Sequence, residues 1–444
     1  MVADFGINRE IRDAVRDHPI AIDLFSGVGG LSLGLEAAGF HVAVDVEIED
    51  ISGRYAQHNF PLSKVLSGET LGDVKNIDGS ALRRHANVRT RGEIALVAGG
   101  PPCQGFSIAG KKTGVDPLND LVDDFARIVL DARPLAFLME NVPGITTQGS
   151  KKLAACVREL RKEYDVADPE VLCAWHFGVP QTRRRVFIVG FRKDLGVTPS
   201  LPQPTHEAPN QNIALFDVSP TAWEAISDIP HVDRYVRLIS GDRVPYEIEP
   251  LHEYQRMLRS DPIGAFSGVI PRSWDPSLCT NLRRTRHGDA LLKTFEGLRF
   301  GQADPVSGIR RLHPHELATT IRAGTTKARG SWSAPRPLHP FQNRVLTTRE
   351  CARIQSFPDW FLFHPIKWHG NRMVGNAVPP LLARAVGRHI LQILGLRAQP
   401  NFNGATLIRD DSLVQSDIEA AQNSDYHKRS ISQKVTSWSN RRTA

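Results

Sequence analysis

Short apolar runs alternate with longer amphipathic segments between residues 20 and 191. The runs are almost continuously aliphatic, and the segments that follow them repeat their apolar positions at helical spacing. Strands of this kind, separated by helices, are typical of a parallel sheet that helices cover on both faces. The pattern therefore predicts a doubly wound α/β domain. The expected strands are Ile20–Phe25, His41–Val46, Ile94–Ala98, Leu135–Met139 and Val186–Phe191, and the expected helices are Leu31–Gly39, Asp50–Phe60, Leu121–Ala132 and Lys151–Glu163.

The pattern changes after Phe191, where Pro, His, Arg and Trp become frequent and the periodicity fades. This change predicts a second, smaller, basic and loop-rich domain. Helical patterning returns in Arg344–Asp359 and in Pro379–Leu396, while the end of the chain is polar and rich in Ser, Asn and Gln, which is typical of disorder. We expect a main domain over 1–191, a second domain over 192–345, a helical segment completing the main domain over 346–396, and a disordered tail over 397–444.

Composition narrows the class of protein. The chain has 444 residues with 41% hydrophobic and 23% charged side chains, as soluble globular proteins do. Its net charge of +7 favours a polyanionic partner. No apolar run approaches the roughly 20 residues of a membrane span, and the charged N-terminus does not resemble a signal peptide. The five cysteines form no CxxC pair, so we expect no metal site, no disulfide framework and a cytoplasmic location.

The stretch "LVAGGPPCQGFS" surrounds Cys103 with glycines and prolines. Either this cysteine is a small buried side chain at a tight turn, or its sulfur has to be held at one point in space. Cysteines at other positions lack such a loop and are expected to be inert: Cys156, Cys173, Cys279 and Cys351.

The stretch "DLFSGVGGLSLGLEAAGF" follows the first expected strand and opens a helix, where doubly wound folds bind cofactors. Its glycines match neither GxGxxG nor a phosphate-binding P-loop. Glu47 follows the second strand, where an acidic residue binds ribose hydroxyls, and Asp73 is expected at the end of a third strand, where it suits adenine. These positions indicate an adenosine cofactor without a pyrophosphate.

Six segments together resemble the motifs of bacterial DNA (cytosine-5)-methyltransferases, which use S-adenosyl-L-methionine. They occur in the order of that family, and the resemblance covers about residues 20 to 392, apart from the variable stretch before Leu346. The family's fold is a mostly parallel sheet domain with a small target-recognition domain, which agrees with the pattern above. The segments are "DLFSGVGGLSLGLEAAGF", "GGPPCQGFS", "ENVPG", "QTRRR", "LTTRECARIQSFPD" and "GNAVPP".

The resemblance implies a role for each residue that matches a motif. Cys103 corresponds to the nucleophile, and Glu140 to the group that binds and protonates the cytosine ring at nitrogen 3. Arg183 and Arg185 correspond to the arginines that hold the nucleophile loop and the flipped base. The matching cofactor-binding positions are Phe25, Gly27, Gly29, Glu47, Asp73 and Asn376, and the matching substrate-binding positions are Pro102, Gln104, Asn141 and Gln181.

The resemblance also implies partners: double-stranded DNA, bound by a monomer, and a cognate restriction endonuclease where the methylase belongs to a restriction–modification system. Arginine-rich loops in the second domain suit phosphates and guanine edges. Two alternatives stay open. One is the tRNA-directed branch of the family, although its Cys-Phe-Thr segment is absent here. The other is a catalytically silent protein that binds DNA or the cofactor, although the reacting residues are all in place.

Overall fold

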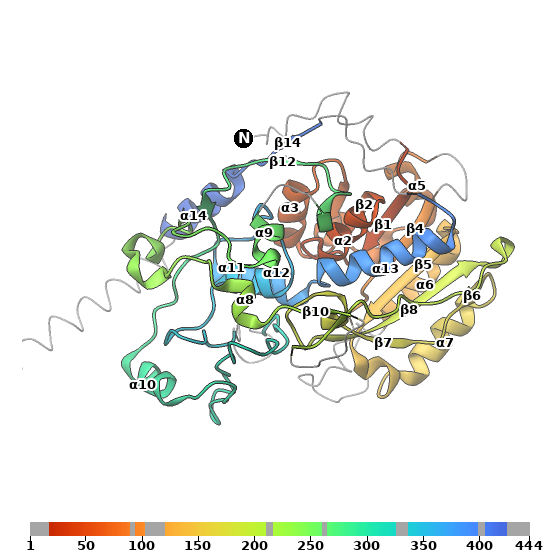
Figure 1. The fold of residues 1–444 in the computed structure, drawn as a ribbon. Coiled ribbons are helices and arrows are strands. Elements are labelled where there is room, and N and C mark those ends of the chain that lie inside the picture. Colours follow the sequence, from red (N-terminus) through yellow and green to blue (C-terminus); the bar gives the residue numbers. More distant parts are fainter. Residues whose placement is uncertain are drawn as a thin grey trace, which may run out of the picture.

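A mainly parallel sheet forms the centre of the protein in the computed structural model (Figure 1). The structure describes residues 17–88, 94–102, 120–209, 216–259, 264–325, 336–397 and 405–423. The strand order is β3-β2-β1-β4-β5-β8-β6, and β7 pairs with β8. The strands are β1 (Ile20–Leu24), β2 (His41–Glu47), β3 (Lys64–Ser67), β4 (Ile94–Gly99), β5 (Ala136–Asn141), β6 (Tyr164–Val166), β7 (Glu170–Cys173) and β8 (Arg184–Arg192).

The predicted α/β class is confirmed, with an antiparallel edge. Strands β1 to β5 pair in parallel, whereas β8 runs antiparallel to β5, β6 and β7. Since β8 runs the other way, its first residues lie beside the last residues of β5. This reversal brings the "QTRRR" segment to the edge of the sheet where the parallel strands end.

Helices cover both faces of the sheet, because successive strand residues are buried on opposite sides. Ala21 and Leu96 face one hydrophobic cluster, and Ile22 and Val97 face the other. Helices α2 (Gly30–Ala38), α3 (Asp50–Asn59) and α13 (Pro380–Ile393) contribute to the first cluster, and α5 (Gly79–His85), α6 (Leu121–Ala132) and α7 (Ser150–Leu160) to the second. Gly34 permits α13 to cross α2 closely, because a Cβ there would lie 2.3 Å from the Cβ of Ala383.

The region after β8 has short elements joined by long loops, at the centre and left of Figure 1, with α10 at the lower left. In this region, buried arginines donate hydrogen bonds to loop carbonyls that would otherwise be bonded in a β-sheet. Arg349 has no exposed surface and donates to the carbonyls of Pro358 and Phe361. The elements include β9 (His206–Glu207), β10 (Asp217–Val218), α8 (Ala222–Ile226), β11 (Val244–Pro245), α9 (Glu253–Arg259), β12 (Arg272–Ser273), β13 (Leu278–Cys279), α10 (Asp289–Gly297), α11 (Thr348–Ile354) and α12 (Lys367–Asn376).

The end of the chain differs from the expected disordered tail. Within the described residues 405–423, β14 (Leu407–Ile408) pairs with β12, and α14 (Ser412–Asn423) buries Val414 and Ile418. The hydroxyl of Tyr55 donates to Asp417 at 2.8 Å. The polar composition concealed a short amphipathic helix that docks beside α3.

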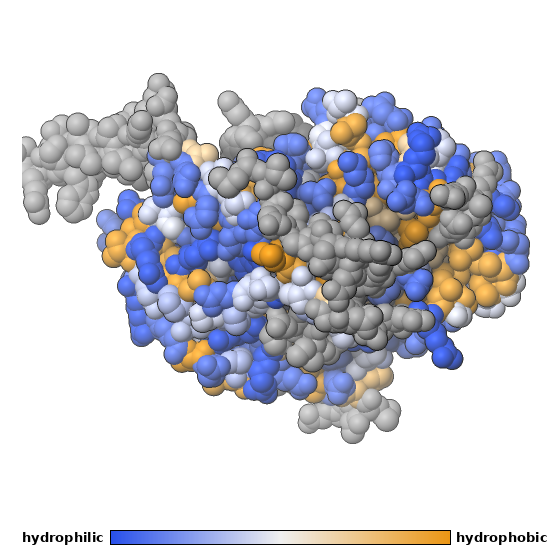
Figure 2. Space-filling model, turned by 90° about the horizontal axis from the view of Figure 1, so that it is seen from above, coloured by the Kyte–Doolittle hydropathy of each residue, from blue (hydrophilic) through white to orange (hydrophobic). Residues whose placement is uncertain are grey.

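The surface is mixed in character. Figure 2 shows hydrophobic residues interspersed with hydrophilic ones over the face it presents, with hydrophilic colour predominating on the left. None of the helices in the described part of the chain is both long and apolar enough to cross a bilayer.

Candidate active site

The predicted site segments meet at one edge of the sheet. Strands β1, β2, β4 and β5 end there, and β8 begins there. The strand order reverses between β1 and β4, and open α/β sheets bind ligands outside the carboxyl ends of the strands at such a point. The site predicted from the sequence therefore lies where this fold accommodates a ligand.

The turn after β1 has the backbone that its glycines permit. Phe25, Gly27 and Gly29 have φ values of 59°, 60° and 94°. A Cβ at Gly29 would lie 2.2 Å from the ring of Phe60, so this position requires glycine. A Cβ at Gly27 would meet nothing within 4 Å in the described structure. The turn thus leaves open space into which a ligand can approach the backbone.

Glu47 fastens this turn to the end of β2. Its carboxylate accepts from the backbone N–H of Gly27 at 2.8 Å and from that of Glu49 at 2.7 Å. Burial raises the pKa of Glu47 to about 7, while these two hydrogen bonds oppose the shift. The turn and the acidic residue predicted to bind the cofactor are therefore adjacent, as an adenosine group would require.

The expected strand before Asp73 was wrong. Strand β3 ends at Ser67, and the short helix α4 (Gly68–Leu71) separates it from Asp73. The Asp73 carboxylate instead caps a turn of 3₁₀ helix (Val74–Asn76) by accepting from the N–H of Lys75. The segment still reaches the site, because a Cβ at Gly72 would lie 2.1 Å from the carbonyl oxygen of Glu47.

The chain approaches Cys103 beside the end of β5. The side chain of Asn141 donates to the carbonyl of Pro101 at 2.9 Å, and Pro102 is the last described residue of this stretch. A Cβ at Gly100 would lie 3.0 Å from a carboxylate oxygen of Glu140. Cys103 and Gln104 themselves lie outside the described residues.

Glu140 and Arg185 form an ion pair across the antiparallel junction of β5 and β8. The guanidinium Nε lies 2.9 Å from the Glu140 carboxylate, and both side chains are largely buried. Burial lowers the pKa of Arg185, and the neighbouring carboxylate counteracts this shift. Among the described residues, these two predicted catalytic groups are in direct contact.

Arg183 lies deeper, with 1% of its surface exposed. It donates to the carbonyls of Gly375 at 3.1 Å and Ile321 at 3.2 Å, while its Nε has no hydrogen-bond partner within the described structure. Burial lowers its pKa, and the charge of Arg185 lowers it further. Arg184, which lies between Arg183 and Arg185 in the sequence, is exposed.

Gln181 joins three distant segments from inside the protein. It has no exposed surface, donates to Gln355 at 2.6 Å and accepts from the N–H of Ile321 at 3.0 Å. Gln355 in turn donates to the carbonyl of Ala377 at 2.7 Å. Gln181, which the resemblance matches to a substrate-binding position, therefore lies in the interior of the protein. Gln355 was not singled out from the sequence, and nothing in its motif position reveals this contact.

Asn376 is the exposed last residue of α12, next to a close backbone contact. A Cβ at Gly375 would lie 2.4 Å from the backbone nitrogen of Ala323. Arg372 of the same helix forms an ion pair with Glu49, its Nε lying 3.2 Å from the carboxylate, and so joins α12 to the chain just after β2. The "GNAVPP" segment is thereby held at the same edge as Glu47.

Two buried carboxylates lie beneath the glycine turn and were not expected to matter. The Ser32 hydroxyl lies 2.7 Å from a carboxylate oxygen of Asp23 and 2.6 Å from one of Asp45. Burial raises the pKa of Asp23 well above its usual range and that of Asp45 to about 6. Acidic residues inside the apolar runs "IAIDLF" and "HVAVDV" were the available signal.

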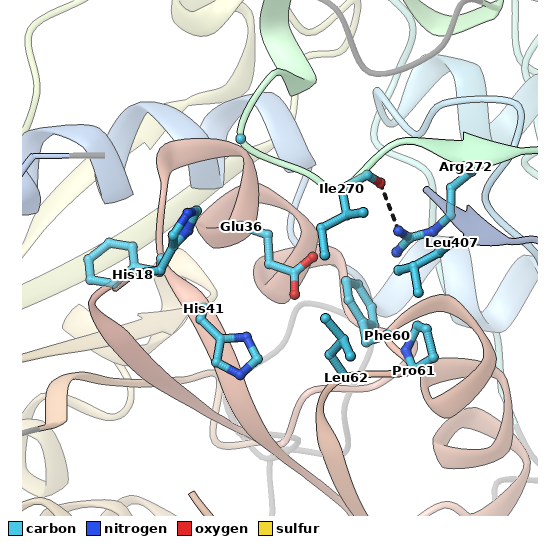
Figure 3. A pocket seen from close by; sticks show the side chains of 11 residues that line it. His18, Glu36, His41, Phe60, Pro61, Leu62, Ile270, Arg272 and Leu407 are labelled. Atoms are coloured by element: carbon cyan, nitrogen blue, oxygen red, sulfur yellow. Dashed lines mark hydrogen bonds between the residues drawn. The ribbon is translucent and has the colours of Figure 1, made fainter. Parts of the chain in front are cut away.

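A small cavity lies at the opposite edge of the sheet, near the amino ends of β1 and β2 (Figure 3). Its volume of about 20 Å³ suits a single water molecule. Glu36 points into it between Ile270 and Leu62, and burial raises the pKa of this carboxyl to about 8. No group of three His, Cys, Asp or Glu side chains in the described residues could hold a metal ion.

Comparison with known proteins agrees with this geometry. The family model described as C-5 cytosine-specific DNA methylase matches residues 20–392. Type II methyltransferase M.XorII of Xanthomonas oryzae pv. oryzae is 38% identical over 400 residues, covering 89% of this chain and 90% of that protein. Type II methyltransferase M1.HphI of Haemophilus parahaemolyticus is 33% identical, covering 84% of this chain and 86% of that protein. A crystal structure described as a prophage-encoded DNA modification methyltransferase (E. coli) has a TM-score of 0.69 at 30% identity, covering 85% of this chain and 99% of that one.

Proposed function

Since the chain belongs to the C-5 cytosine-specific DNA methylases, we propose that it methylates carbon 5 of a flipped cytosine in double-stranded DNA through a covalent bond to Cys103. S-adenosylmethionine supplies the methyl group when bound. We assign its adenine and ribose to the space beside Phe25, Gly27, Glu47 and the chain around Asp73. The open space beside Gly27 and the adjacent Glu47 carboxylate support this assignment.

The reaction needs a nucleophile because carbon 5 of cytosine attacks a methyl donor poorly. Addition of the Cys103 thiolate to carbon 6 pushes electron density onto carbon 5 and divides one difficult step into easier ones. Glu140 donates a proton to ring nitrogen 3 as the carbon–sulfur bond forms, so that no anion builds up on the ring. After methyl transfer, the carbon 5 proton leaves to a water or hydroxide. Expulsion of the thiolate, with return of the nitrogen 3 proton to Glu140, then restores the aromatic ring.

Arg185 positions both the Glu140 carboxyl and the target cytosine. Its Nε holds the Glu140 carboxyl at 2.9 Å, which leaves other N–H donors of the guanidinium for the carbonyl oxygen of cytosine. Arg183 holds the carbonyls of Ile321 and Gly375 in the interior, and we assign it to support of the nucleophile loop. The target base has to leave the DNA stack to reach these groups, since none of them can enter a paired duplex.

The biological role follows from the relatives. Several of them are named Type II methyltransferases, which supports a modification methylase of a restriction–modification system, with a cognate endonuclease as partner. All predicted site segments come from one chain, so a monomer suffices. Bacterial DNA lies in the cytoplasm, and we place the enzyme there.

The observation that carries this proposal is the contact between Glu140 and Arg185 beside the chain that leads to Cys103. The test is base-resolution mapping of 5-methylcytosine in DNA from a bacterial host that lacks cytosine methylation and expresses the protein. We expect one short motif to be methylated throughout, and methylation to disappear in Cys103→Ala. The control Cys173→Ser replaces a half-buried thiol beside Arg184, which is not one of the proposed reacting groups, and should methylate normally.

Two outcomes would overturn the proposal. Full methylation by Cys103→Ala would show that the nucleophile is wrong. Unmodified DNA, together with folded protein that still binds S-adenosylmethionine, would exclude DNA methylation, and the same mark would then be sought in host tRNA.

A further inference from the structure

Four cationic side chains gather away from the catalytic groups without any carboxylate partner among the described residues. Arg283 and Arg286 belong to the loop before α10, Arg336 precedes α11, and Lys367 begins α12. Other arginines of the region pair with acids, as Arg243, Arg259 and Arg353 do. The carboxylate of Asp233 pairs with the neighbouring Arg284 at 2.9 Å instead.

Arg283 shows most clearly that the cluster lacks a partner. Only 7% of its surface is exposed, and its Nη1 has no hydrogen-bond partner in the described structure. A buried charged group without a partner costs free energy, so a protein keeps one only where something else completes it. The Asp242 carboxylate acts on Arg283 electrostatically without forming an ion pair with it.

The backbone holds these cations together despite their mutual repulsion. The Lys367 ammonium donates to the carbonyl of Arg284 at 2.8 Å. Arg336 donates to the Thr285 hydroxyl at 3.0 Å and to the carbonyl of Leu346 at 2.9 Å. These neutral acceptors position both side chains against the loop of Arg283 and Arg286 without neutralising their charge.

Like-charge repulsion is visible at Lys367. Burial, followed by the charges of Arg336, Arg283 and Arg286, lowers the pKa of this ammonium to about 7. His287 beside the cluster adds no positive charge at neutral pH, because burial and then the charges of Arg336 and Lys367 lower its pKa to about 4. An anion bound here would relieve the repulsion and restore the charge on Lys367.

We propose that Arg283, Arg286, Arg336 and Lys367 form a subsite for the phosphodiester backbone of DNA, a few nucleotides along the strand from the target nucleotide. The inference rests on the proposed function and deepens it. Lys367 and Asn376 are the two ends of the ten-residue helix α12, which places the subsite about 14 Å from the catalytic edge at 1.5 Å per residue. At about 3.4 Å per base along one strand, this is roughly four nucleotides from the flipped base.

The test is the salt dependence of binding to a duplex that carries the methylated motif. Loss of one phosphate contact makes the plot of the logarithm of the association constant against the logarithm of the salt concentration shallower by about 0.9. At 0.1 M salt this corresponds to an affinity loss of about eightfold. We expect this reduction for Arg286→Gln, whose exposed side chain does not support the fold, and for Lys367→Gln. The double variant should lose about twice as much slope.

Controls separate charge from folding. Lys367→Arg keeps the charge and should retain the wild-type slope. Arg158→Gln removes an exposed arginine from α7, behind the sheet, and should leave both slope and affinity unchanged. A wild-type slope in Arg286→Gln and Lys367→Gln would overturn the subsite, as would an affinity loss that is the same at every salt concentration.

Failure of the subsite can be distinguished from failure of the proposed function. If wild-type protein methylates DNA and the variants keep its slope, only the subsite is wrong. If wild-type protein neither binds nor methylates DNA, the proposed function fails first.

Discussion

The amide of Asn141 offers a sharp test of how the nucleophile loop is positioned. Only 4% of this residue is exposed. Its Nδ2 donates to the carbonyl of Pro101 at 2.9 Å, and its Oδ1 accepts from the N–H of Val142 at 2.9 Å. One side chain thus joins the end of β5 to the chain that leads into Cys103. We predict that Asn141→Ala slows methyl transfer by letting this chain move.

The magnitude follows from the hydrogen bonds. Leaving a buried carbonyl without its donor costs about 1–3 kcal/mol. If this cost falls on the transition state, where the thiol has to be in place, the rate falls by about 5- to 150-fold. Asn141→Asp should be slower still, because its carboxylate can accept from Val142 but faces the carbonyl oxygen of Pro101 as a second acceptor.

The assay is single-turnover methyl transfer at saturating DNA and S-adenosylmethionine, with thermal unfolding measured in parallel. Asn59→Ala is a matched control, because Asn59 is about as buried as Asn141 and its side chain also makes two hydrogen bonds to backbone. Its amide donates to the carbonyl of Leu362 and accepts from the N–H of the same residue. It lies at the end of α3, near the opposite edge of the sheet, so it should lower stability without slowing transfer. Wild-type transfer by a folded Asn141→Ala protein would refute the positioning role.

Three further predictions follow from the same structure. Gly375→Ala should lower kcat more than tenfold in steady-state assays, because the new Cβ would lie 2.4 Å from backbone atoms of Ala323; normal turnover would exclude this constraint. Gln181→Glu should lower stability by about 1–3 kcal/mol in urea titrations by putting a charge where only buried partners exist; an unchanged midpoint would contradict it. The Glu36 carboxyl has a pKa of about 8 in the folded protein. It contributes stability that is fully present below pH 4.5 and is lost as the pH rises through 8, so the melting temperature should decline over this range. Glu36→Gln should make that decline smaller.

Local patterning predicted the central sheet because long buried strands leave a strong signal. The strands expected at Ile20, His41, Ile94 and Val186 were found within about two residues of their predicted bounds. Strands β3, β6 and β7 were missed, since they span only three or four residues and mix charged with apolar positions. A run that short does not reveal which strand it pairs with, and these segments form strands because they pair with a neighbouring strand of the sheet.

Contacts between distant segments could not be predicted from the sequence for a different reason. Gln181 meets Gln355 because two loops return to the same edge of the sheet, and no local pattern encodes that return. Asp73 was assigned to a strand end because "GDV" follows an apolar stretch, but α4 intervenes. The family motifs indicated which residues belong to the site, and the fold shows which of them touch each other.

Arginine illustrates why composition alone misjudges an interface. Arg311 in the loop-rich region is 5% exposed and donates to the carbonyls of Phe295, Leu298 and His339, so its guanidinium serves as internal structure. Arg283 is buried to nearly the same extent, yet part of its guanidinium has no partner in the described structure. The two residues look alike in sequence, each within a basic run that suggests DNA binding. The number of internal acceptors distinguishes them. The proposed DNA backbone subsite therefore rests on an incompletely paired guanidinium within a cluster of cations, and not on net charge.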